Sequence, residues 1–387
     1  MHNFYQNKGG EDVVFESEKL LLKSYGHDVS LYVVNNSLID GLKSKIKTFL
    51  TVSYSEAVRK KLTTVLKESN PDIVHIHNFF PLLSPSIFDA CFDCGIPVIQ
   101  TLHNYRTICP GGLLLRDGKV CEKCIEGSAY QAVRHRCYKK SFFGTYSVSR
   151  MVDKSRNNGT WKNKVTKFIA LTEFAKKKFI QAGFPESKLT VKSNFIFDLG
   201  DYSKDKQVHS SGALFVGRLS QEKGILTLIN AWQKLEVNLT VIGTGPLENI
   251  IQASKNSYIN VLGEQEQKLV RLEMRKATFL VVPSEWYEGF PMVLVEAFSQ
   301  GLPIIVSGLG SLAEIVQDGF NGLHFEHGNA NDLAEKVRWM VEHPDMCKKM
   351  GKNARTSYLE KYTPNKNYDE LISLYKLAIK ENDDKKN

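Results

Sequence analysis

The sequence predicts an α/β protein with two doubly wound domains, and three observations support this. Short apolar segments typical of parallel strands alternate with amphipathic helical segments along the chain. The alternation stops at the polar stretch Asp198–Ser211 and restarts after it. The length of 387 residues also exceeds that of a typical single domain. We therefore predict an N-terminal domain over residues 1–200 and a C-terminal domain over residues 210–362.

In the first half, the patterns predict strands and helices in alternation. The expected strands are Asp28–Val34, Ile73–His77, Pro97–Leu102 and Lys167–Leu171. The expected helices are Glu11–Tyr25, Ser53–Ser69, Ser84–Cys94 and Thr172–Ala182. Only seven residues precede the glycine loop that begins at Lys8, so we expect the first strand of this domain to be missing from the chain.

The second half repeats the pattern more clearly. The expected strands are Ala213–Val216, Leu239–Ile242, Ile259–Leu262, Phe279–Val282, Pro303–Ser307 and Gly322–Phe325. The expected helices include Ile225–Lys234, Gln265–Lys276, Val293–Gln300 and Ala330–His343. A last helix, about residues 367–381, follows the break at Thr363-Pro364, and we expect it to pack back onto the first domain. Such sheets bind ligands outside the carboxyl ends of their strands, so the expected site is the crevice between the domains.

Composition and charge limit the classes of function. The chain is 42% hydrophobic and 24% charged, as in ordinary globular proteins. No apolar run reaches the length of about 18 residues needed to span a membrane, and no signal peptide is visible, so we expect a cytoplasmic protein. Residues 1–200 hold 29 Lys and Arg against 18 Asp and Glu, a net charge of +11, whereas the remainder has −2. A basic half suits an anionic membrane or an acidic substrate, or is only a lysine-rich surface. No nucleic-acid-binding module is present.

Two carboxylates, Glu288 and Glu296, lie on either side of a predicted helix start. Glu288 lies in a glycine-containing loop after the strand Phe279–Val282, and we place Glu296 in the first turn of a helix that begins near Met292. Such a helix start offers free N–H groups to an anionic or hydroxyl-rich ligand, and a carboxylate there can accept hydrogen bonds from ribose hydroxyls. The alternative is that the acids only complement the helix dipole.

A second loop, which follows the strand Ala213–Val216, carries Gly217, Arg218 and Lys223. Two fixed cations can neutralise the charge that develops on a diphosphate leaving group. An exposed basic loop is the alternative. A third strand ends in a turn with Gly243 and Gly245, which either leaves room for a base or ribose or is a simple glycine turn.

In this order and spacing, the motifs resemble those of the retaining GT-B glycosyltransferases called glycosyl transferases group 1, which include glycogen-synthase-like enzymes and mannosyltransferases. The resemblance covers nearly the whole chain. Its most specific parts are Val216–Gly224, which is similar to a GRLxxEKG phosphate loop, and the intact E-x7-E at Glu288–Glu296. The N-terminal half contributes Lys8–Glu11, similar to the family's glycine loop, Pro71–His77, similar to its PDxVHxH strand, and Thr101–Asn104, similar to its strand-end histidine.

The resemblance implies a GT-B fold, in which two Rossmann-like domains face a central cleft, and a retaining transfer of sugar from a nucleotide diphosphate donor. Arg218 and Lys223 would bind the diphosphate in place of a metal, so that catalysis requires no cofactor. Glu296 would hold the ribose hydroxyls. A leaving-group oxygen that takes the acceptor's proton on the same face would retain configuration, and double displacement is the open alternative.

The family's other sugar contacts map onto both halves of the chain. The resemblance implies contacts to the transferred sugar from Glu288 and from the backbone of Gly289, Phe290 and Pro291. It also implies that Gly10 approaches the phosphates from the first domain and that His103 lies beside the sugar and the acceptor hydroxyl. His75 and His77 alternate on one strand, so we expect at least one of them to be structural.

Four cysteines, Cys109, Cys121, Cys124 and Cys137, cluster in an insertion at about residues 105–140 that has many turn residues and few apolar ones. Their spacing suits a structural tetrahedral zinc, with His135 as a competing fourth ligand. Reduced thiols in a loop are the alternative. A second CxxC pair, at Cys91 and Cys94, ends an amphipathic helix, where we expect plain burial.

The same insertion is basic, which predicts a place for an anionic lipid-linked acceptor or for the membrane itself. Its basic residues are Arg106, Arg116, Arg134, Arg136, Lys139 and Lys140. The resemblance implies a glycosyltransferase of cell-surface polysaccharide synthesis, and the basic charge predicts a peripheral position at the inner face of the plasma membrane. The alternatives are a non-catalytic GT-B partner subunit and a GT-B epimerase or phosphorylase, and we find no cofactor lysine of the phosphorylase type.

Overall fold

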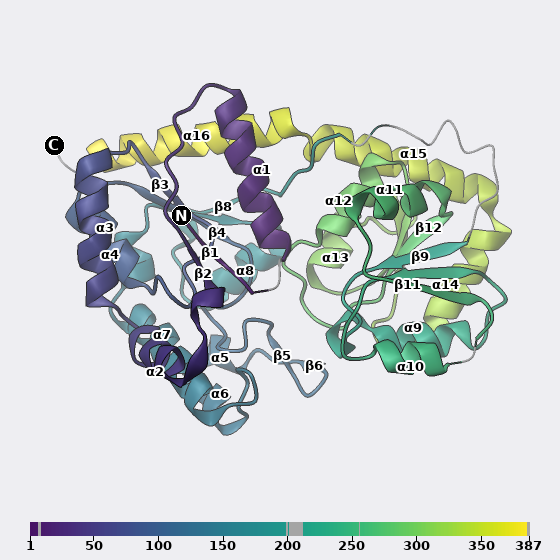
Figure 1. Ribbon diagram of the computed structural model, residues 1–387. Helices are drawn as coiled ribbons and strands as arrows, with labels where there is room; N and C mark the ends of the chain where they lie inside the picture. Colours follow the sequence, from purple (N-terminus) through teal and green to yellow (C-terminus); the bar gives the residue numbers. More distant parts are fainter. Residues whose placement is uncertain (7–8, 199, 201–211, 255, 385–387) are drawn as a thin grey trace. The chain divides into compact units, whose positions relative to one another are not determined.

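The chain folds into two compact units (Figure 1). The computed structural model describes residues 1–6, 9–198, 200, 212–254 and 256–384. Unit 1 comprises Met1–Leu114, Cys121–Asn194 and Asn367–Asn387, and unit 2 comprises Leu115–Val120 and Phe195–Lys366. The segment Leu115–Val120 thus belongs to unit 2, although it lies within the insertion that the sequence analysis assigns to the N-terminal domain. Lys8 and most of the polar stretch between the predicted domains lie outside the described residues.

Unit 2 is built on a six-stranded parallel sheet with the order β11-β10-β9-β12-β13-β14. Its strands are β9 (Ala213–Val216), β10 (Leu239–Ile242), β11 (Ile259–Gly263), β12 (Phe279–Val282), β13 (Ile304–Ser307) and β14 (Gly322–Phe325). The chain moves outward from β9 to β11, returns to pair β12 with β9, and then moves outward in the other direction. This is the doubly wound order, and its switch point lies between β9 and β12. The predicted α/β class with parallel sheets is confirmed.

Helices cover both faces of this sheet, with α9 and α10 on one side and α11 and α12 on the other (Figure 1). The strands are nearly continuous apolar runs because a parallel sheet covered on both faces has no solvent side. The helices of unit 2 are η4 (Gln221–Lys223), α9 (Ile225–Trp232), α10 (Glu248–Ala253), α11 (Gln267–Lys276), α12 (Met292–Ser299), α13 (Gly310–Ile315), α14 (Ala330–Glu342) and α15 (Pro344–Lys361).

Unit 1 contains a four-stranded parallel sheet, β3 (Val74–Ile76), β4 (Val98–Leu102), β7 (Lys167–Ala170) and β8 (Leu189–Val191). A first strand, β1 (His2–Phe4), pairs in parallel with β2 (Val33–Asn35), so the prediction of a missing first strand is wrong. Backbone hydrogen bonds from His77 to Met1 and from Asn3 to Asn78 also connect β1 with the end of β3. The strand was missed because it is short and carries buried polar side chains: His2 contacts Asp12 at 2.6 Å, and Asn3 donates to Asn36 at 2.8 Å. The predicted strand Asp28–Val34 is also largely wrong, since β2 begins only at Val33.

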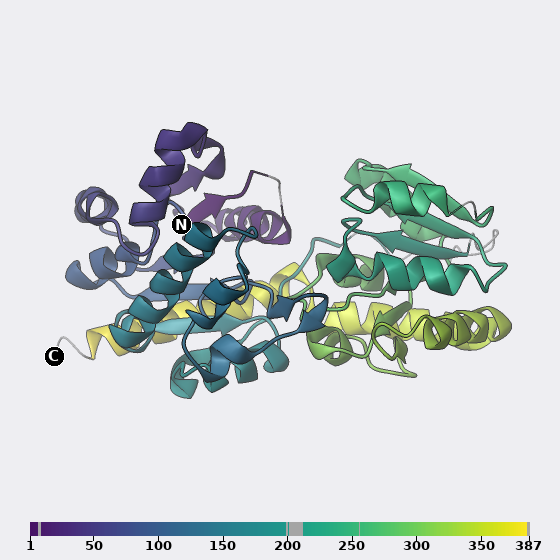
Figure 2. The same cartoon turned by 90° about the horizontal axis from the view of Figure 1, so that it is seen from below.

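The helices of unit 1 include several that the patterns did not predict. They are α1 (Gly10–Ser24), η1 (Asn36–Leu38), α2 (Gly41–Thr51), α3 (Glu56–Ser69), α4 (Ser86–Asp93), α5 (Lys123–Glu126), α6 (Gln131–Arg134), α7 (Phe142–Asn157), η2 (Thr160–Lys164), α8 (Glu173–Gln181) and η3 (Glu186–Lys188). A short hairpin, β5 (Leu115–Arg116) and β6 (Lys119–Val120), lies in the segment assigned to unit 2. The last helix, α16 (Pro364–Asp383), runs along the strands of unit 1 (Figures 1 and 2). Its Glu381 pairs with Lys167 of β7 at 2.6 Å.

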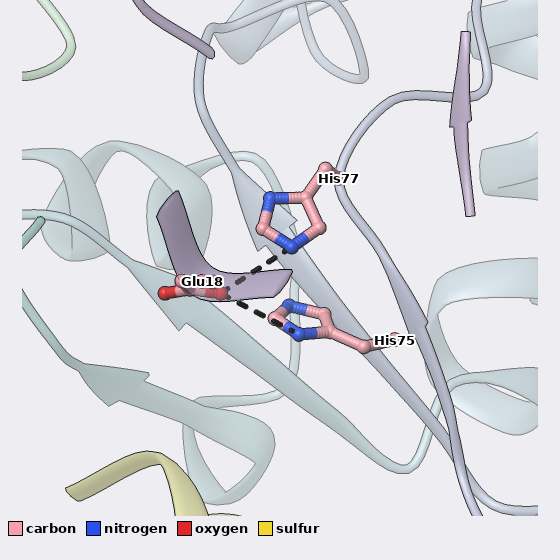
Figure 3. A group of neighbouring side chains, drawn as sticks. All are labelled: Glu18, His75 and His77. Carbon is pink, nitrogen blue, oxygen red and sulfur yellow. Dashed lines mark ion pairs between the residues drawn. The ribbon is translucent and has the colours of Figure 1, made fainter. Parts of the chain in front are cut away.

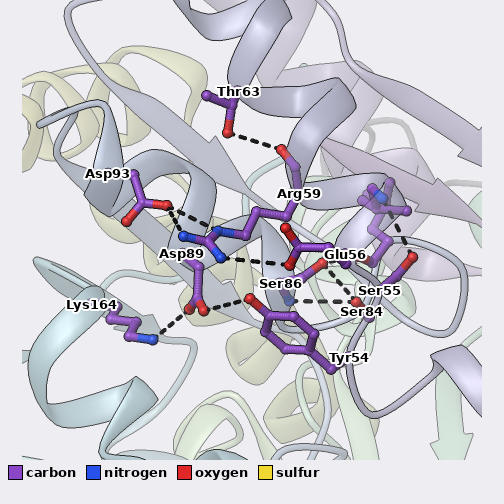
Figure 4. Close-up of polar contacts among 12 residues, drawn as sticks. Tyr54, Ser55, Glu56, Arg59, Thr63, Ser84, Ser86, Asp89, Asp93 and Lys164 are labelled. Atoms are coloured by element: carbon purple, nitrogen blue, oxygen red, sulfur yellow. Dashed lines mark hydrogen bonds and ion pairs between the residues drawn. The ribbon is translucent and has the colours of Figure 1, made fainter.

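A polar network joins the helices that flank β3 and β4 (Figure 4). Arg59 of α3 pairs with Asp93 of α4 at 2.6 Å. Asp89 of α4 accepts hydrogen bonds from Tyr54 at 2.9 Å and from Lys164 of η2 at 2.6 Å. Asp89 is well shielded, with 15% of its side chain exposed, so these contacts hold more strongly than surface ion pairs would. The network therefore ties α4 to α3 and to η2.

Candidate active site

The loops that follow β9 and β12 meet at the switch point of unit 2, where doubly wound sheets bind ligands. The backbone N–H of Glu285 donates to the carbonyl of Glu222 across the two loops at 2.9 Å. Gly224 has φ +71°, and a Cβ on it would lie 1.8 Å from the carbonyl oxygen of Pro283. Only glycine therefore fits at this position, and the tertiary fold brings together two motifs that are far apart in sequence.

Lys223 and Glu288 form the centre of this site. The Lys223 ammonium lies 2.6 Å from Glu288 Oε1, which also accepts a hydrogen bond from Ser284 at 2.7 Å. The Glu288 side chain is 6% exposed and that of Lys223 is 26% exposed, so the cation forms the solvent-facing half of the pair. Lys223 Nζ also lies 5.6 Å from the centroid of the Trp286 ring. The cation is thus held in place on the solvent side of a buried carboxylate.

Arg218 lies on the same loop as Lys223, and its side chain is exposed. Among the described residues it forms no ion pair, which leaves its guanidinium able to meet an anion. A Cβ added to Gly217 would make only an ordinary van der Waals contact, with the Phe215 ring at 3.4 Å.

Gly243 and Gly245 differ from Gly217, because backbone fills the space beside them. A Cβ on Gly243 would lie 2.0 Å from the carbonyl oxygen of Gly217, and one on Gly245 would lie 2.4 Å from that of Leu219. Gly243 also has φ +134°. In this structure the two glycines let the loops after β9 and β10 pack against each other.

Glu296 is the fifth residue of α12, so it lies in the second helical turn and not in the first as predicted. It is partly buried, and Gln267 donates to its Oε1 at 3.5 Å. Burial raises the pKa of Glu296, while the Arg271 guanidinium opposes the shift. Of the loop residues before α12, Phe290 is buried with its ring 5.9 Å from that of Tyr362, so only its backbone can face a ligand. Pro291 is the N-cap of α12, and Gly289 lies in the same loop.

The predicted site residues of unit 1 lie on the loops that follow β1 and β4. Gly10 is the exposed first residue of α1. His103 follows β4 and is partly buried, with its Nε2 3.1 Å from His77 Nδ1. Its neighbour Asn104 donates to Glu11 at 3.0 Å. Burial raises the pKa of Glu11 to about 7, and the carboxylate of Asp12 adds to the shift.

A buried charged cluster beneath His103 was missed by the sequence analysis. Glu18 of α1 faces His75 of β3 and His77, which follows that strand (Figure 3). Lys192 pairs with Glu18 at 2.8 Å, and both residues are 2% exposed. One signal could have shown it: Val14, Glu18 and Leu21 share the buried face of α1, and a glutamate there needs a partner.

The ligand atoms of Glu18, His75 and His77 lie within 4.8 Å of one another, a spacing that would suit a metal ion. The positive charge of Lys192 already satisfies the Glu18 carboxylate, and both ring nitrogens of His75 contact protein hydroxyls, those of Tyr375 at 2.7 Å and Thr101 at 2.8 Å. His75 is therefore structural, as expected for at least one of the pair, and a second cation here would meet repulsion.

Two family models match consecutive parts of the chain. The model described as Glycosyltransferase Family 4 matches residues 9–197, and the model described as Glycosyl transferases group 1 matches residues 201–357. The chain has the GT-B fold of glycosyltransferases.

Known proteins similar to this GT-B chain agree with that assignment. An uncharacterized glycosyltransferase of Methanocaldococcus jannaschii, MJ1178, is 37% identical over 43% of this chain, and the match spans about half, 46%, of that relative. The capsular polysaccharide biosynthesis glycosyltransferase CapM of Staphylococcus aureus is 27% identical over 57% of this chain and 64% of CapM. The structure of Anabaena Alr3699/HepE in complex with UDP covers 96% of this chain and 99% of that chain, with a TM-score of 0.65 and 16% identity, a likeness of fold.

The four clustered cysteines of this GT-B chain lie in unit 1, and none of them forms a disulfide within the described residues. The Cys109 Sγ and the Cys137 Cβ both lie 3.7 Å from the position that a Cβ on Gly111 would take. Burial raises the pKa of the Cys124 thiol to about 12, and the three other cysteines add to the shift. Within the described ranges, however, no three of the four Sγ atoms lie within 4.8 Å of one another. Of the second pair, Cys91 is fully buried as expected, whereas Cys94 is only partly buried.

We propose that these four thiols hold a structural zinc, for which the Sγ atoms would have to close to about 3.8 Å from one another. We expect about one zinc per chain in protein purified without chelator, and a lower Tm after chelation. Mutation of Cys121 and Cys124 to serine should remove the metal, whereas the control Cys94→Ser should keep it. Metal-free protein whose Tm does not respond to chelator would refute the zinc site.

Proposed function

We propose that this protein is a retaining glycosyltransferase that transfers a sugar from a nucleotide diphosphate donor to a glycan or lipid-linked acceptor in cell-surface polysaccharide synthesis. The observation that carries the proposal is the Lys223–Glu288 pair, 2.6 Å apart, beside Arg218 at the switch point of unit 2. The UDP named for Anabaena HepE and the capsular role named for CapM support the donor class and the setting.

In the proposed reaction, the bond between the sugar C1 and the diphosphate oxygen breaks, and the nucleoside diphosphate leaves with the electron pair. Lys223 and Arg218 stabilise the negative charge that develops on the leaving group, so the transfer needs no metal or other cofactor. The acceptor hydroxyl forms the new bond to C1 and gives its proton to an oxygen of the departing phosphate. Attack on the face that the diphosphate leaves retains the configuration.

The alternative is a non-catalytic partner subunit with the same fold. A binding subunit has no chemical need for two cations placed for a leaving group together with a buried carboxylate that holds one of them. The chain keeps Arg218, Lys223, Glu288 and Glu296, which favours the enzyme.

A screen of nucleotide sugars tests the proposed function. We expect full-length protein to bind at least one UDP-, GDP-, ADP- or dTDP-sugar in calorimetry and to hydrolyse it slowly without acceptor. UDP-sugars are the first to test. Absence of binding to every donor in the panel would overturn the enzymatic proposal.

We also propose that unit 1 binds an anionic membrane through an apolar and basic surface on α2 and α7, which we call the α2–α7 surface. None of the described helices is both long and apolar enough to cross a bilayer. On α2, however, Leu42, Ile46 and Leu50 follow one another at a spacing of four and are 75%, 51% and 59% exposed. Phe143 of α7 is 70% exposed and lies beside Phe49, with ring centroids 6.4 Å apart.

Charge complements this apolar stripe. Lys43, Lys45 and Lys47 are exposed on α2, and Lys139 and Lys140 are exposed just before α7. A helix with an apolar stripe between lysines is typical of segments that lie in the headgroup region of anionic lipid. One residue of the predicted basic insertion, Arg106, is less available to anionic lipid than expected. Its guanidinium stacks over Phe80 at 4.8 Å and donates to the carbonyl of Pro110.

Liposome flotation tests the α2–α7 surface. We expect the protein to float with vesicles that contain about 30% anionic lipid and not with neutral vesicles, because both apolar insertion and charge contribute. The double variant Ile46→Glu/Leu50→Glu should lose flotation without losing stability, since both side chains are exposed. Leu359→Glu, on the 51% exposed Leu359 of α15, is the control and should float normally. Equal flotation on neutral vesicles, or an unaffected double variant, would count against the proposal.

A further inference from the structure

A row of polar contacts leads from the interior of unit 1 to His103. It begins at Lys192, whose ammonium lies 2.8 Å from Glu18 Oε1. The other carboxylate oxygen, Glu18 Oε2, lies 3.3 Å from His77 Nε2 (Figure 3). On the other side of this ring, His77 Nδ1 lies 3.1 Å from His103 Nε2. His103 comes directly after β4 and is the outermost of these side chains along the row.

Glu18 is ionised in this environment. Its carboxylate and the Lys192 ammonium are both buried, and each would be costly without the other. Burial acts to raise the pKa of Glu18, but the Lys192 ammonium outweighs it and holds the pKa below its ordinary value. Within the described part of the chain, Glu18 Oε2 accepts no hydrogen bond, so a buried anionic oxygen faces His77 Nε2.

The three histidines of this region are neutral. Burial lowers the pKa of His75, His77 and His103 well below the ordinary value, and neighbouring positive groups add to the effect. A neutral imidazole carries one N–H and one lone pair, so each contact in the row must pair a donor with an acceptor. Which nitrogen holds the proton is therefore decided by the neighbours.

Only one arrangement of protons suits all of the contacts. A carboxylate oxygen repels a lone pair, so His77 carries its proton on Nε2, toward Glu18. His77 Nδ1 is then an acceptor, and His103 must donate from Nε2. The remaining nitrogen of His103, Nδ1, keeps its lone pair. In the opposite arrangement, a lone pair on His77 Nε2 would face the buried carboxylate, and His103 Nδ1 would become a donor.

We propose that Glu18 is a positioning residue that, through His77, fixes His103 as the Nε2–H tautomer and so makes its Nδ1 a hydrogen-bond acceptor for a substrate hydroxyl. The role of His103 in sugar transfer rests on the proposed function. The arrangement of protons among Glu18, His77 and His103 does not depend on it. An acceptor at this nitrogen selects a hydroxyl group and rejects a carbonyl or phosphate oxygen, which bring no proton.

Histidine tautomers can be measured directly in full-length protein labelled with 15N-histidine. Long-range 1H–15N spectra distinguish the two tautomers, and the variants His77→Gln and His103→Gln assign the signals among the ten histidines. We expect the Nε2–H tautomer for both residues in the wild type. In Glu18→Gln, the side-chain amide can turn its NH2 toward His77 Nε2, and we expect the Nδ1–H tautomer of His103 to appear.

Activity supplies a second readout. We expect Glu18→Gln to lower kcat by about 10- to 100-fold, as loss of a hydrogen-bonded support commonly does, while the dissociation constant of the donor changes less than twofold. Because Lys192 loses its counter-ion in this variant, Glu18→Gln/Lys192→Met should regain stability and still show the altered tautomer. The control Glu16→Gln, on the exposed side of α1 where Glu16 pairs with Lys19, should match the wild type in both readouts.

Two results would overturn the inference: an Nδ1–H tautomer of His103 in the wild type, or an unchanged tautomer in both Glu18 variants. If the spectra show the expected tautomers but the protein neither binds nor transfers a sugar, the proposed function is overturned and the proton arrangement is supported. The two failures are therefore distinguishable.

Discussion

Replacement of Lys223 by methionine is expected to lower kcat/KM for sugar transfer by about 10²- to 10³-fold. The cation is held 2.6 Å from Glu288 beyond the carboxyl ends of β9 and β12, and removal of one preorganised group that meets developing charge has an effect of this size. Steady-state transfer from the donor found in the nucleotide-sugar screen measures the change. The loss should appear mainly in kcat, because the charge on the leaving group is greatest in the transition state.

Two comparisons separate this effect from damage to the fold. Lys223→Met leaves the buried Glu288 without its cation, so its Tm must be measured, and Lys223→Arg keeps the charge and should retain much more activity. Lys276→Met is the matched control, because Lys276 is 49% exposed on α11 and pairs with Glu273. A Lys223→Met enzyme with native Tm and native kcat would remove the proposed role of this residue.

Replacement of Glu296 by glutamine is expected to weaken binding of the donor nucleotide by about 10- to 100-fold at neutral pH. The variant keeps the shape of the side chain but loses the charge, and hydrogen bonds to a charged group are worth about 1.5 to 3 kcal/mol. Calorimetry with the free nucleoside diphosphate measures the effect without turnover. Glu335→Gln, on the exposed side of α14, is the control and should bind normally.

The pH dependence of the same binding gives an independent check on Glu296. Burial raises the pKa of this carboxyl above that of an ordinary glutamate, so it becomes protonated at a higher pH as the solution is acidified. A protonated carboxyl is a weaker acceptor for ribose hydroxyls, so affinity should fall as the pH drops through the raised pKa. Glu296→Gln should lack this component of the pH profile. An identical profile in the wild type and the variant would contradict the assignment.

Much of unit 2 could be predicted from the sequence because the local residue pattern of its strands agrees with the burial that the folded sheet imposes. A parallel sheet covered on both faces needs continuous apolar strands, and the segment that became β12 shows this pattern together with clear loop residues. In unit 1 the two requirements diverge. The strand β1 is short and polar, and its stability depends on buried partners such as Asp12 and Asn36, which no local pattern shows.

The helix α2 was missed for a different reason. Its apolar residues, such as Leu42 and Ile46, have helical spacing, but none of its residues is buried. Packing against a core therefore does not hold this helix in place as it holds the buried helices. The same exposure is what makes the α2–α7 surface a candidate for a membrane. Sequence spacing identifies an apolar stripe, whereas only the folded chain shows whether that stripe is covered.

The sequence by itself determined the α/β class, the parallel sheet of unit 2 and the identity of the charged residues of the candidate site. Motifs reveal these features because charge, glycine conformational freedom and strand burial are properties of short segments. The tertiary structure alone decided that Lys223 and Glu288, which are 65 positions apart, form one ion pair at the switch point between β9 and β12. It also decided that Glu18 and Lys192 lie beneath the histidines that lead to His103. Such contacts depend on strand order and on burial, which arise only when distant segments pack together.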